Sequence, residues 1–146
     1  MSAVVLDTNI VLDLFVFGDA ASQPLERVLE LGPQQGGLQW LATQPMRDEL
    51  ARVLDYPQIV PRLAYYALDA AAVLARFDAQ ARLVAVPAKA PVTCADADDQ
   101  KFIDLAVAHG ALLLSKDKDV LSMRKRLSVH GVRAQRAIDL VAQEVM

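Results

Sequence analysis

Two carboxylates follow apolar runs that have the form of buried strands. Asp7 comes directly after the β-branched run 4–6, and Asp117 comes shortly after the apolar run 111–114. Each acid can simply cap the helix that follows, because short polar side chains accept hydrogen bonds from a helix N-terminus. The carboxyl ends of parallel strands, however, are also where ligands bind in α/β sheets. The two acids are therefore candidates for a shared site as well as candidate caps.

Two further carboxylates lie on or beside the apolar faces of predicted helices. Glu49 is three residues after Met46 and four before Val53, and both of these neighbours belong to an apolar stripe. Asp99 shares a helical face with Ile103. Ionised carboxylates are rarely buried without a partner. The alternative for Glu49 is a position at the edge of the stripe, with its carboxylate reaching water.

The start of the helix that carries Asp99 is crowded with acids. Asp96, Asp98 and Asp99 all lie there. The helix macrodipole favours one or two negative charges at an N-terminus, but it explains three less well. Like charges at close range repel or raise one another's pKa unless a cation lies between them.

If the two helices pack beside the two strand ends, four carboxylates converge on one pocket. Lys116 and Lys118 are expected to be the only basic residues near this pocket. Ligation by oxygen atoms alone favours Mg²⁺ or Mn²⁺. Such a cation keeps bound water, binds substrate phosphates and lowers the pKa of the water. The spacing of the acids therefore predicts a divalent-metal site suited to phosphate chemistry.

The composition excludes several other kinds of site. A single cysteine, Cys94, rules out a disulfide framework and a cysteine-rich zinc site. His109 and His130 are too few and too far apart for a histidine metal cage. Aromatic residues make up only 5%, which argues against base-stacking platforms. Asp7 and Asp13 interrupt the apolar N-terminal stretch, so it is neither a signal peptide nor a membrane span, and a cytoplasmic location is expected.

Basic residues concentrate toward the C-terminus, although the net charge is −3. No Lys or Arg precedes Arg27. The cluster is either an ordinary solvated helix face or a basic rim beside the acidic centre, suited to a phosphate backbone. The candidate RNA contacts are Lys116, Lys118, Arg124, Lys125 and Arg126.

Strands and helices are expected to alternate along a single domain, residues 1–146. Strands are predicted at 4–6, 38–41, 83–86, 111–114 and near Val132, and helices at 9–17, 22–31, 43–55, 62–79, 98–109, 117–127 and from Arg136 onward. This alternation is typical of the α/β class. It predicts a three-layer α/β/α sandwich around a mainly parallel sheet of four to five strands, with the third strand at its centre.

Four segments carry a family resemblance, in the same order as the family's motifs. They are residues 4–9 (VVLDTN), 49–50 (EL), 99–106 (DQKFIDLA) and 115–119 (SKDKD). With these segments, nearly the whole chain resembles a PIN domain, a family named from the PilT N-terminus. Residues 94–102 further resemble a bacterial subgroup, the toxin components of toxin–antitoxin pairs (VapC-like ribonucleases), except that Ala95 and Ala97 stand where that subgroup tends to have Arg and Pro.

The resemblance implies a function and a set of site residues. It implies an Mg²⁺- or Mn²⁺-dependent endoribonuclease that hydrolyses single-stranded RNA and leaves a 5′-phosphate. The catalytic and metal-binding residues implied are Asp7, Glu49, Asp99 and Asp117. The auxiliary residues implied are Thr8, Asn9, Ser115 and Asp119, with Asp98 as an alternative to Asp99. Such toxins commonly form homodimers and are inhibited by a small antitoxin protein.

Other functions fit parts of the pattern. A PIN nuclease with a housekeeping role in RNA processing, or one that acts on DNA, has the same acids. A non-catalytic PIN-like scaffold is a further alternative, and such a protein is expected not to bind Mn²⁺. A phosphotransfer receiver needs an acid at the end of the central strand, whereas the third strand ends in Pro87. A metal-independent ribonuclease that uses His109 and His130 retains its activity in EDTA.

Overall fold

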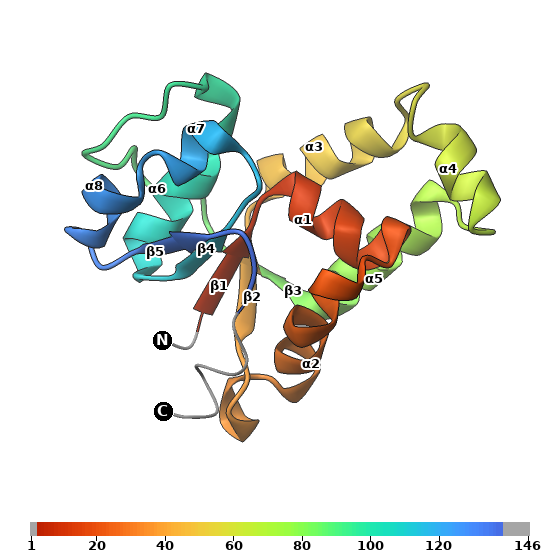
Figure 1. Cartoon of the computed structure of the whole chain (residues 1–146), viewed down its shortest axis with the longest axis horizontal. Coiled ribbons are helices and arrows are strands. Elements are labelled where there is room, and N and C mark those ends of the chain that lie inside the picture. The colour runs from red at the N-terminus through yellow and green to blue at the C-terminus, as the bar shows by residue number, and fades with distance from the viewer. Residues whose placement is uncertain (1–2, 139–146) are drawn as a thin grey trace.

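The protein was examined as a computed structural model that describes residues 3–138. No helix in this range is long and apolar enough to cross a membrane. The chain forms one sheet with helices on both of its faces (Figure 1). This arrangement is the predicted α/β/α sandwich, and the sheet has five strands.

All neighbouring strands in the sheet are parallel. Their order is β3-β2-β1-β4-β5. The strands are β1 (Ala3–Leu6), β2 (Gln39–Ala42), β3 (Ala81–Leu83), β4 (Leu112–Leu114) and β5 (Arg133–Gln135). The central strands β1 and β4 are apolar and almost fully buried, as expected for parallel strands covered on both faces.

The helices form two layers, one on each side of the sheet (Figure 1). One layer holds α1 (Thr8–Leu12), the π-helical turn η1 (Asp13–Phe17), α2 (Gln23–Leu31), α3 (Gln44–Leu54), α4 (Val60–Tyr65) and α5 (Ala70–Gln80). The other holds α6 (Gln100–His109), α7 (Lys118–Leu121) and α8 (Arg124–Ser128). The division follows from right-handed crossovers, because the chain moves one way along the sheet from β1 to β3 and the opposite way from β3 to β5. The short 3₁₀ turns are η2 (Ala20–Ser22), η3 (Pro33–Gln35) and η4 (Ala97–Asp99).

Aromatic packing joins β2 to the first helical layer. The Trp40 side chain is 1% exposed and meets Phe77 of α5 edge-on, with ring centroids 4.9 Å apart. Phe15 of η1 packs on the other side of Trp40 at 5.8 Å. On the opposite face, α6 buries Phe102 and Ile103 and contacts β1 and β4. The first layer is thus packed against β2, the neighbour of β1, and the second layer is packed against β1 and β4, whose ends carry Asp7 and Asp117.

The predicted helix 62–79 was wrong, because the chain breaks between α4 and α5. Ala67 has a φ of 56°, in the left-handed region that alanine rarely adopts. Asp69 then caps α5, since its side chain accepts a hydrogen bond of 2.8 Å from the Ala72 amide. Alanine-rich composition favours helix along the whole stretch, so it does not reveal the break.

The third strand was also predicted wrongly, in extent and in position. It covers Ala81–Leu83 rather than 83–86, and it lies at the edge of the sheet. The central strand is β1, which does end in an acid, Asp7. The sequence argument against a receiver domain that used Pro87 therefore fails.

The other predicted boundaries moved by smaller amounts. The helix predicted at 9–17 is α1 followed by η1, and the helix predicted at 117–127 divides into α7 and α8. The strand expected near Val132 is β5. The closing helix expected from Arg136 is absent at residues 136–138, and the remainder lies outside the described residues.

Candidate metal centre

The candidate acids lie where the strand order reverses. Asp7 follows β1 and Asp117 lies three residues after β4, and these two strands are neighbours in the sheet. The Asp7 amide donates a 2.9 Å hydrogen bond to the Leu114 carbonyl, so the two strand ends are joined. Crossovers leave β1 and β4 on opposite faces, which opens a crevice between the two helical layers at this point.

Asp7 is buried, and a serine hydroxyl binds one of its carboxylate oxygens. Its side chain is 5% exposed, and the Ser115 hydroxyl donates a 2.6 Å hydrogen bond to Asp7 Oδ2. The Ser115 Oγ atom in turn accepts a 3.0 Å hydrogen bond from the Asp117 amide. Burial raises the pKa of Asp7, and the Ser115 hydrogen bond offsets part of that rise.

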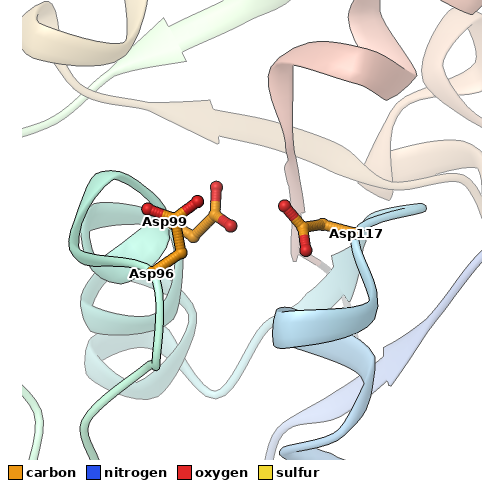
Figure 2. Close-up of side chains that lie close together, drawn as sticks. All are labelled: Asp96, Asp99 and Asp117. Atoms are coloured by element: carbon orange, nitrogen blue, oxygen red, sulfur yellow. The ribbon is translucent and has the colours of Figure 1, made fainter.

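Three carboxylates from two segments face one another: Asp96 and Asp99 come from the start of α6, and Asp117 comes from the loop after β4 (Figure 2). Asp96, Asp99 and Asp117 each offer an oxygen, and these three atoms lie within 4.8 Å of one another. Asp96 and Asp117 are also caps, because they accept hydrogen bonds from the Asp98 and Asp119 amides at 2.9 and 2.8 Å. A carboxylate has two oxygens, so capping and facing a cation are compatible roles.

Asp99 is the acid whose ionised form is most disfavoured by its surroundings. It is 8% exposed, and its Oδ2 atom is buried with no hydrogen-bond partner among the described residues. Burial, the contact with the Asp117 carboxyl, and the charges of Asp7, Asp117 and Asp96 raise the pKa of Asp99 to about 8. A bound cation removes both problems, since it ligates the oxygen and offsets the neighbouring charges.

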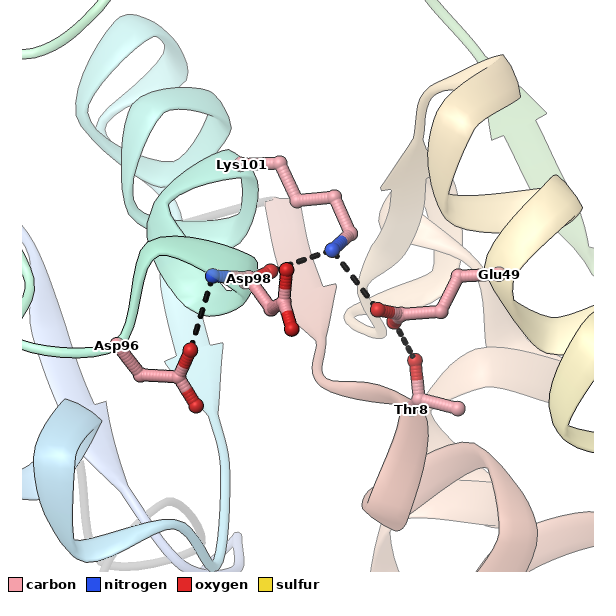
Figure 3. Close-up of polar contacts among 5 residues, drawn as sticks. All are labelled: Thr8, Glu49, Asp96, Asp98 and Lys101. Atoms are coloured by element: carbon pink, nitrogen blue, oxygen red, sulfur yellow. Dashed lines mark hydrogen bonds and ion pairs between the residues drawn. The ribbon is translucent and has the colours of Figure 1, made fainter.

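Glu49 stands beside this group and is engaged through both of its oxygens (Figure 3). The Thr8 hydroxyl donates to Oε2 at 2.5 Å, and Lys101 Nζ lies 2.9 Å from Oε1. Lys101 also donates to the Asp98 carbonyl, so it links α3 to the start of α6. The charge of Glu49 contributes to the raised pKa of Asp7, although burial is the larger cause.

Lys101 corrects the expectation that Lys116 and Lys118 are the only basic residues near the acids. It is two residues after Asp99, and positions i and i+2 of a helix do not share a face. The sequence pattern therefore did not predict a contact between Lys101 and Glu49. Its side chain is long enough to reach from α6 to Glu49 on α3.

Two other residues of the site region were not among the predicted site residues. Asp96 was noted only as part of the acidic helix start, yet it belongs to the close group with Asp99 and Asp117. Asp13 is 7% exposed and pairs with Lys116 Nζ at 2.5 Å. The signal available in the sequence was that Asp13 interrupts the apolar stretch 9–17.

The predicted auxiliary residues fall into two groups. Ser115 and Asn9 join the ends of β1 and β4, since the Ser115 hydroxyl binds Asp7 and Asn9 Oδ1 accepts a hydrogen bond of 3.3 Å from the Lys116 amide. Thr8 binds Glu49 on α3. Asp98 is exposed, and only its backbone takes part in the contacts of Figure 3. Asp119 donates its amide to Asp117 and is half-buried.

The predicted RNA contacts are all exposed, but they do not form one unit. Lys116 and Lys118 flank Asp117 in the sequence, and Lys116 is already paired with Asp13. Arg124, Lys125 and Arg126 lie on α8, which packs on the edge strand β5. The α8 group is therefore separated from β1 by two strand positions.

The comparison with protein families gives a match that covers the whole candidate centre. A family model described as the PIN domain matches residues 3–119, from β1 through Asp119. A search of curated proteins finds no match. Because the matched segment is most of the chain and its fold is the expected α/β/α sandwich, the chain belongs to the PIN domain family.

Proposed function

We propose that the protein is an Mg²⁺- or Mn²⁺-dependent endoribonuclease that cleaves single-stranded RNA. PIN domains are in general metal-dependent nucleases, and this chain has an acidic cluster at the matching place. The observation that carries the proposal is the buried Asp99 carboxylate, which faces Asp96 and Asp117 and has an oxygen without a partner in the described part of the chain.

The residues present fit a hard divalent cation. The donor set consists of carboxylate oxygens, which Mg²⁺ and Mn²⁺ prefer. Asp7, Glu49, Asp99 and Asp117 are the proposed ligands, and Asp96, which has an oxygen within 4.8 Å of oxygens of Asp99 and Asp117, is a further candidate. When bound, the cation lowers the pKa of water and offsets the charge that develops on the phosphate.

The remaining residues are proposed to hold these ligands in place. Ser115 fixes one Asp7 oxygen by its hydrogen bond and binds the Asp117 amide at the same time. Thr8 and Lys101 hold Glu49 in place through its two carboxylate oxygens. Fixed ligands matter because a loosely held site loses the alignment of the attacking water with the phosphorus.

The RNA preference and the toxin role are further parts of the proposal. The RNA preference rests on the resemblance of nearly the whole chain to the PIN family, and the toxin role rests on the resemblance of residues 94–102 to the toxin subgroup. We propose a homodimer and a small antitoxin as partners on the same ground. Expression in a host cell, with mapping of the new RNA ends, distinguishes growth arrest by RNA cleavage from a processing role.

Metal-dependent cleavage is the direct test. The purified protein is expected to cut a fluorescently labelled single-stranded RNA in Mn²⁺ and to lose this activity in EDTA, with recovery when Mn²⁺ is restored. Asp7→Asn is expected to lose more than about 100-fold, beyond the range of outer-shell substitutions, because it removes a ligand charge at nearly constant volume. Cleavage that persists in EDTA contradicts the proposal, as does an Asp7→Asn variant of normal activity.

A charge-reversal variant of α8 tests whether the basic rim meets the phosphate backbone. Lys125→Glu combined with Arg126→Glu is expected to weaken RNA binding and to flatten its dependence on salt. For single-stranded RNA, each lost phosphate contact reduces the magnitude of the negative slope of log K against log salt by about 0.7. Fluorescence anisotropy at several salt concentrations measures this slope. An unchanged slope identifies the two residues as an ordinary solvated face.

A further inference from the structure

A cavity of about 150 Å³ lies beside the metal centre and shares its strand ends. Its lining includes Leu114, whose carbonyl binds the Asp7 amide, and Lys116, which directly precedes Asp117. Ile10 and Leu25 add apolar wall from α1 and α2. A molecule bound in the cavity therefore lies next to the candidate acids and leaves the metal centre free.

A buried carboxylate forms part of this cavity. Asp13 begins the π-helical turn η1, and π-turns inside helices are often found at functional sites. Its Oδ2 atom pairs with Lys116, while the described residues offer no hydrogen-bond partner to Oδ1. Asp13 is 7% exposed, and its ion pair with Lys116 offsets part of the cost of burying its charge.

The dimensions and polarity of the cavity favour one flat ring. A cavity of similar volume in another protein takes up benzene, so a six-membered ring fits. The apolar walls suit the faces of such a ring, and the free oxygen of Asp13 suits a donor on its edge. Among nucleic-acid bases, a carboxylate accepts from the exocyclic amine of cytosine. Arg136, which also lines the cavity, can donate to the base carbonyl or to the adjoining phosphate.

We propose that this cavity binds the base of the nucleotide next to the scissile phosphate and prefers cytosine to uracil. Uracil presents a carbonyl oxygen where cytosine presents its amine, and this oxygen faces the Asp13 carboxylate. A purine exceeds the one-ring volume. The proposal rests on the proposed ribonuclease function, because it assigns a specificity subsite to that reaction.

The test combines a binding readout with a cleavage readout. In metal-free protein, CMP is expected to shift the backbone amide signals of Ile10, Asp13 and Leu25 at concentrations about tenfold lower than UMP does. In Mn²⁺, an oligouridine that contains one cytosine is expected to be cut beside the cytosine about tenfold faster than at matched uridines.

Asp13→Asn is the decisive variant, because an amide presents a donor as well as an acceptor. The cytosine-to-uracil ratio is expected to fall to near one in both measurements. Asp48→Asn, an exposed position on α3, is the matched control and is expected to keep the wild-type ratio. If Asp13→Asn does not fold, Arg136→Gln replaces it: this exposed residue is expected to weaken the binding of CMP several-fold.

The outcomes separate the two proposals. Metal-dependent cleavage with no base preference overturns the subsite and leaves the ribonuclease proposal standing. CMP shifts at the cavity without cleavage of any RNA support a nucleotide site and overturn the ribonuclease proposal. Equal binding of CMP and UMP, or shifts confined to other residues, overturns the subsite.

Discussion

Replacing Asp99 with Asn is expected to abolish divalent-metal-dependent RNA cleavage, with a loss of more than about 100-fold. Asp99 is nearly fully buried, faces Asp96 and Asp117, and has an oxygen with no partner among the residues described. The amide keeps the volume and removes the charge that a cation needs. Cleavage of labelled RNA and calorimetric titration with Mn²⁺ measure the two losses together.

Asp98→Asn is the matched control for this variant. Asp98 precedes Asp99 in the same 3₁₀ turn, but it is exposed and contributes only backbone atoms to the contacts seen there. Its substitution is expected to leave cleavage and Mn²⁺ binding within about twofold of wild type, as for surface changes in general. An inactive Asp98→Asn beside an active Asp99→Asn reverses the assignment of the two acids.

The second large effect is on the pH dependence of stability without metal. The pKa of Asp99 is raised from 3.8 to about 8 in the folded protein. A group with a raised folded-state pKa stabilises the fold below its unfolded pKa, and this contribution is lost as pH rises through the folded pKa. The Asp99 contribution to the free energy of unfolding is therefore expected to fall between about pH 4 and pH 8.

The difference between Asp99→Asn and wild type measures the contribution of Asp99 together with its coupling to the neighbouring carboxylates, while distant carboxylates titrate alike in both proteins. Between pH 5 and pH 8.5, the variant is expected to gain at least about 1 kcal/mol relative to wild type, roughly one pKa unit. Solvent at the open side of the cluster keeps the gain below the full pKa difference. Urea unfolding in EDTA at both pH values measures it, with Asp48→Asn as control.

Divalent metal is expected to reverse the trend. Ligation requires the ionised carboxylate, so Mn²⁺ binding releases a proton from Asp99 and becomes tighter as pH approaches about 8. Wild type in Mn²⁺ is then stabilised more at pH 8.5 than at pH 5. A stability difference between the two proteins that does not change with pH contradicts the raised pKa of Asp99.

The sequence predicted the fold well where hydrophobic patterning decides it. Apolar runs located β1, β2 and β4, and the alternation with helices predicted a parallel sheet covered on both faces. Patterning does not contain strand order, so the third strand was placed at the centre instead of the edge. It also missed the break at Ala67, because a left-handed backbone position leaves no mark in an alanine-rich segment.

For the candidate centre, spacing along one helix or after one strand was informative, and contacts between elements were not. Parallel topology predicts that Asp7 and Asp117 lie at the same edge of the sheet, whereas the adjacency of β1 and β4 is known only from the structure. The pairing of Glu49 with Lys101 depends on how α3 and α6 face each other and on a flexible side chain. Asp96 caps the 3₁₀ turn that contains Asp99, and its carboxylate lies in the close group with Asp99 and Asp117. The roles of these residues stay predictions until the variants are measured.

The hydrogen bond between Asp7 and Ser115 joins residues 108 positions apart, near the two ends of the family match. Domains begin to fold from the N-terminus while synthesis continues. On a translating ribosome, Asp7 emerges first but stays without Ser115 and Asp117 until β4 has left the exit tunnel and docked beside β1. A partly synthesised chain therefore lacks the complete acidic centre. The centre is completed only when translation of the domain is nearly finished.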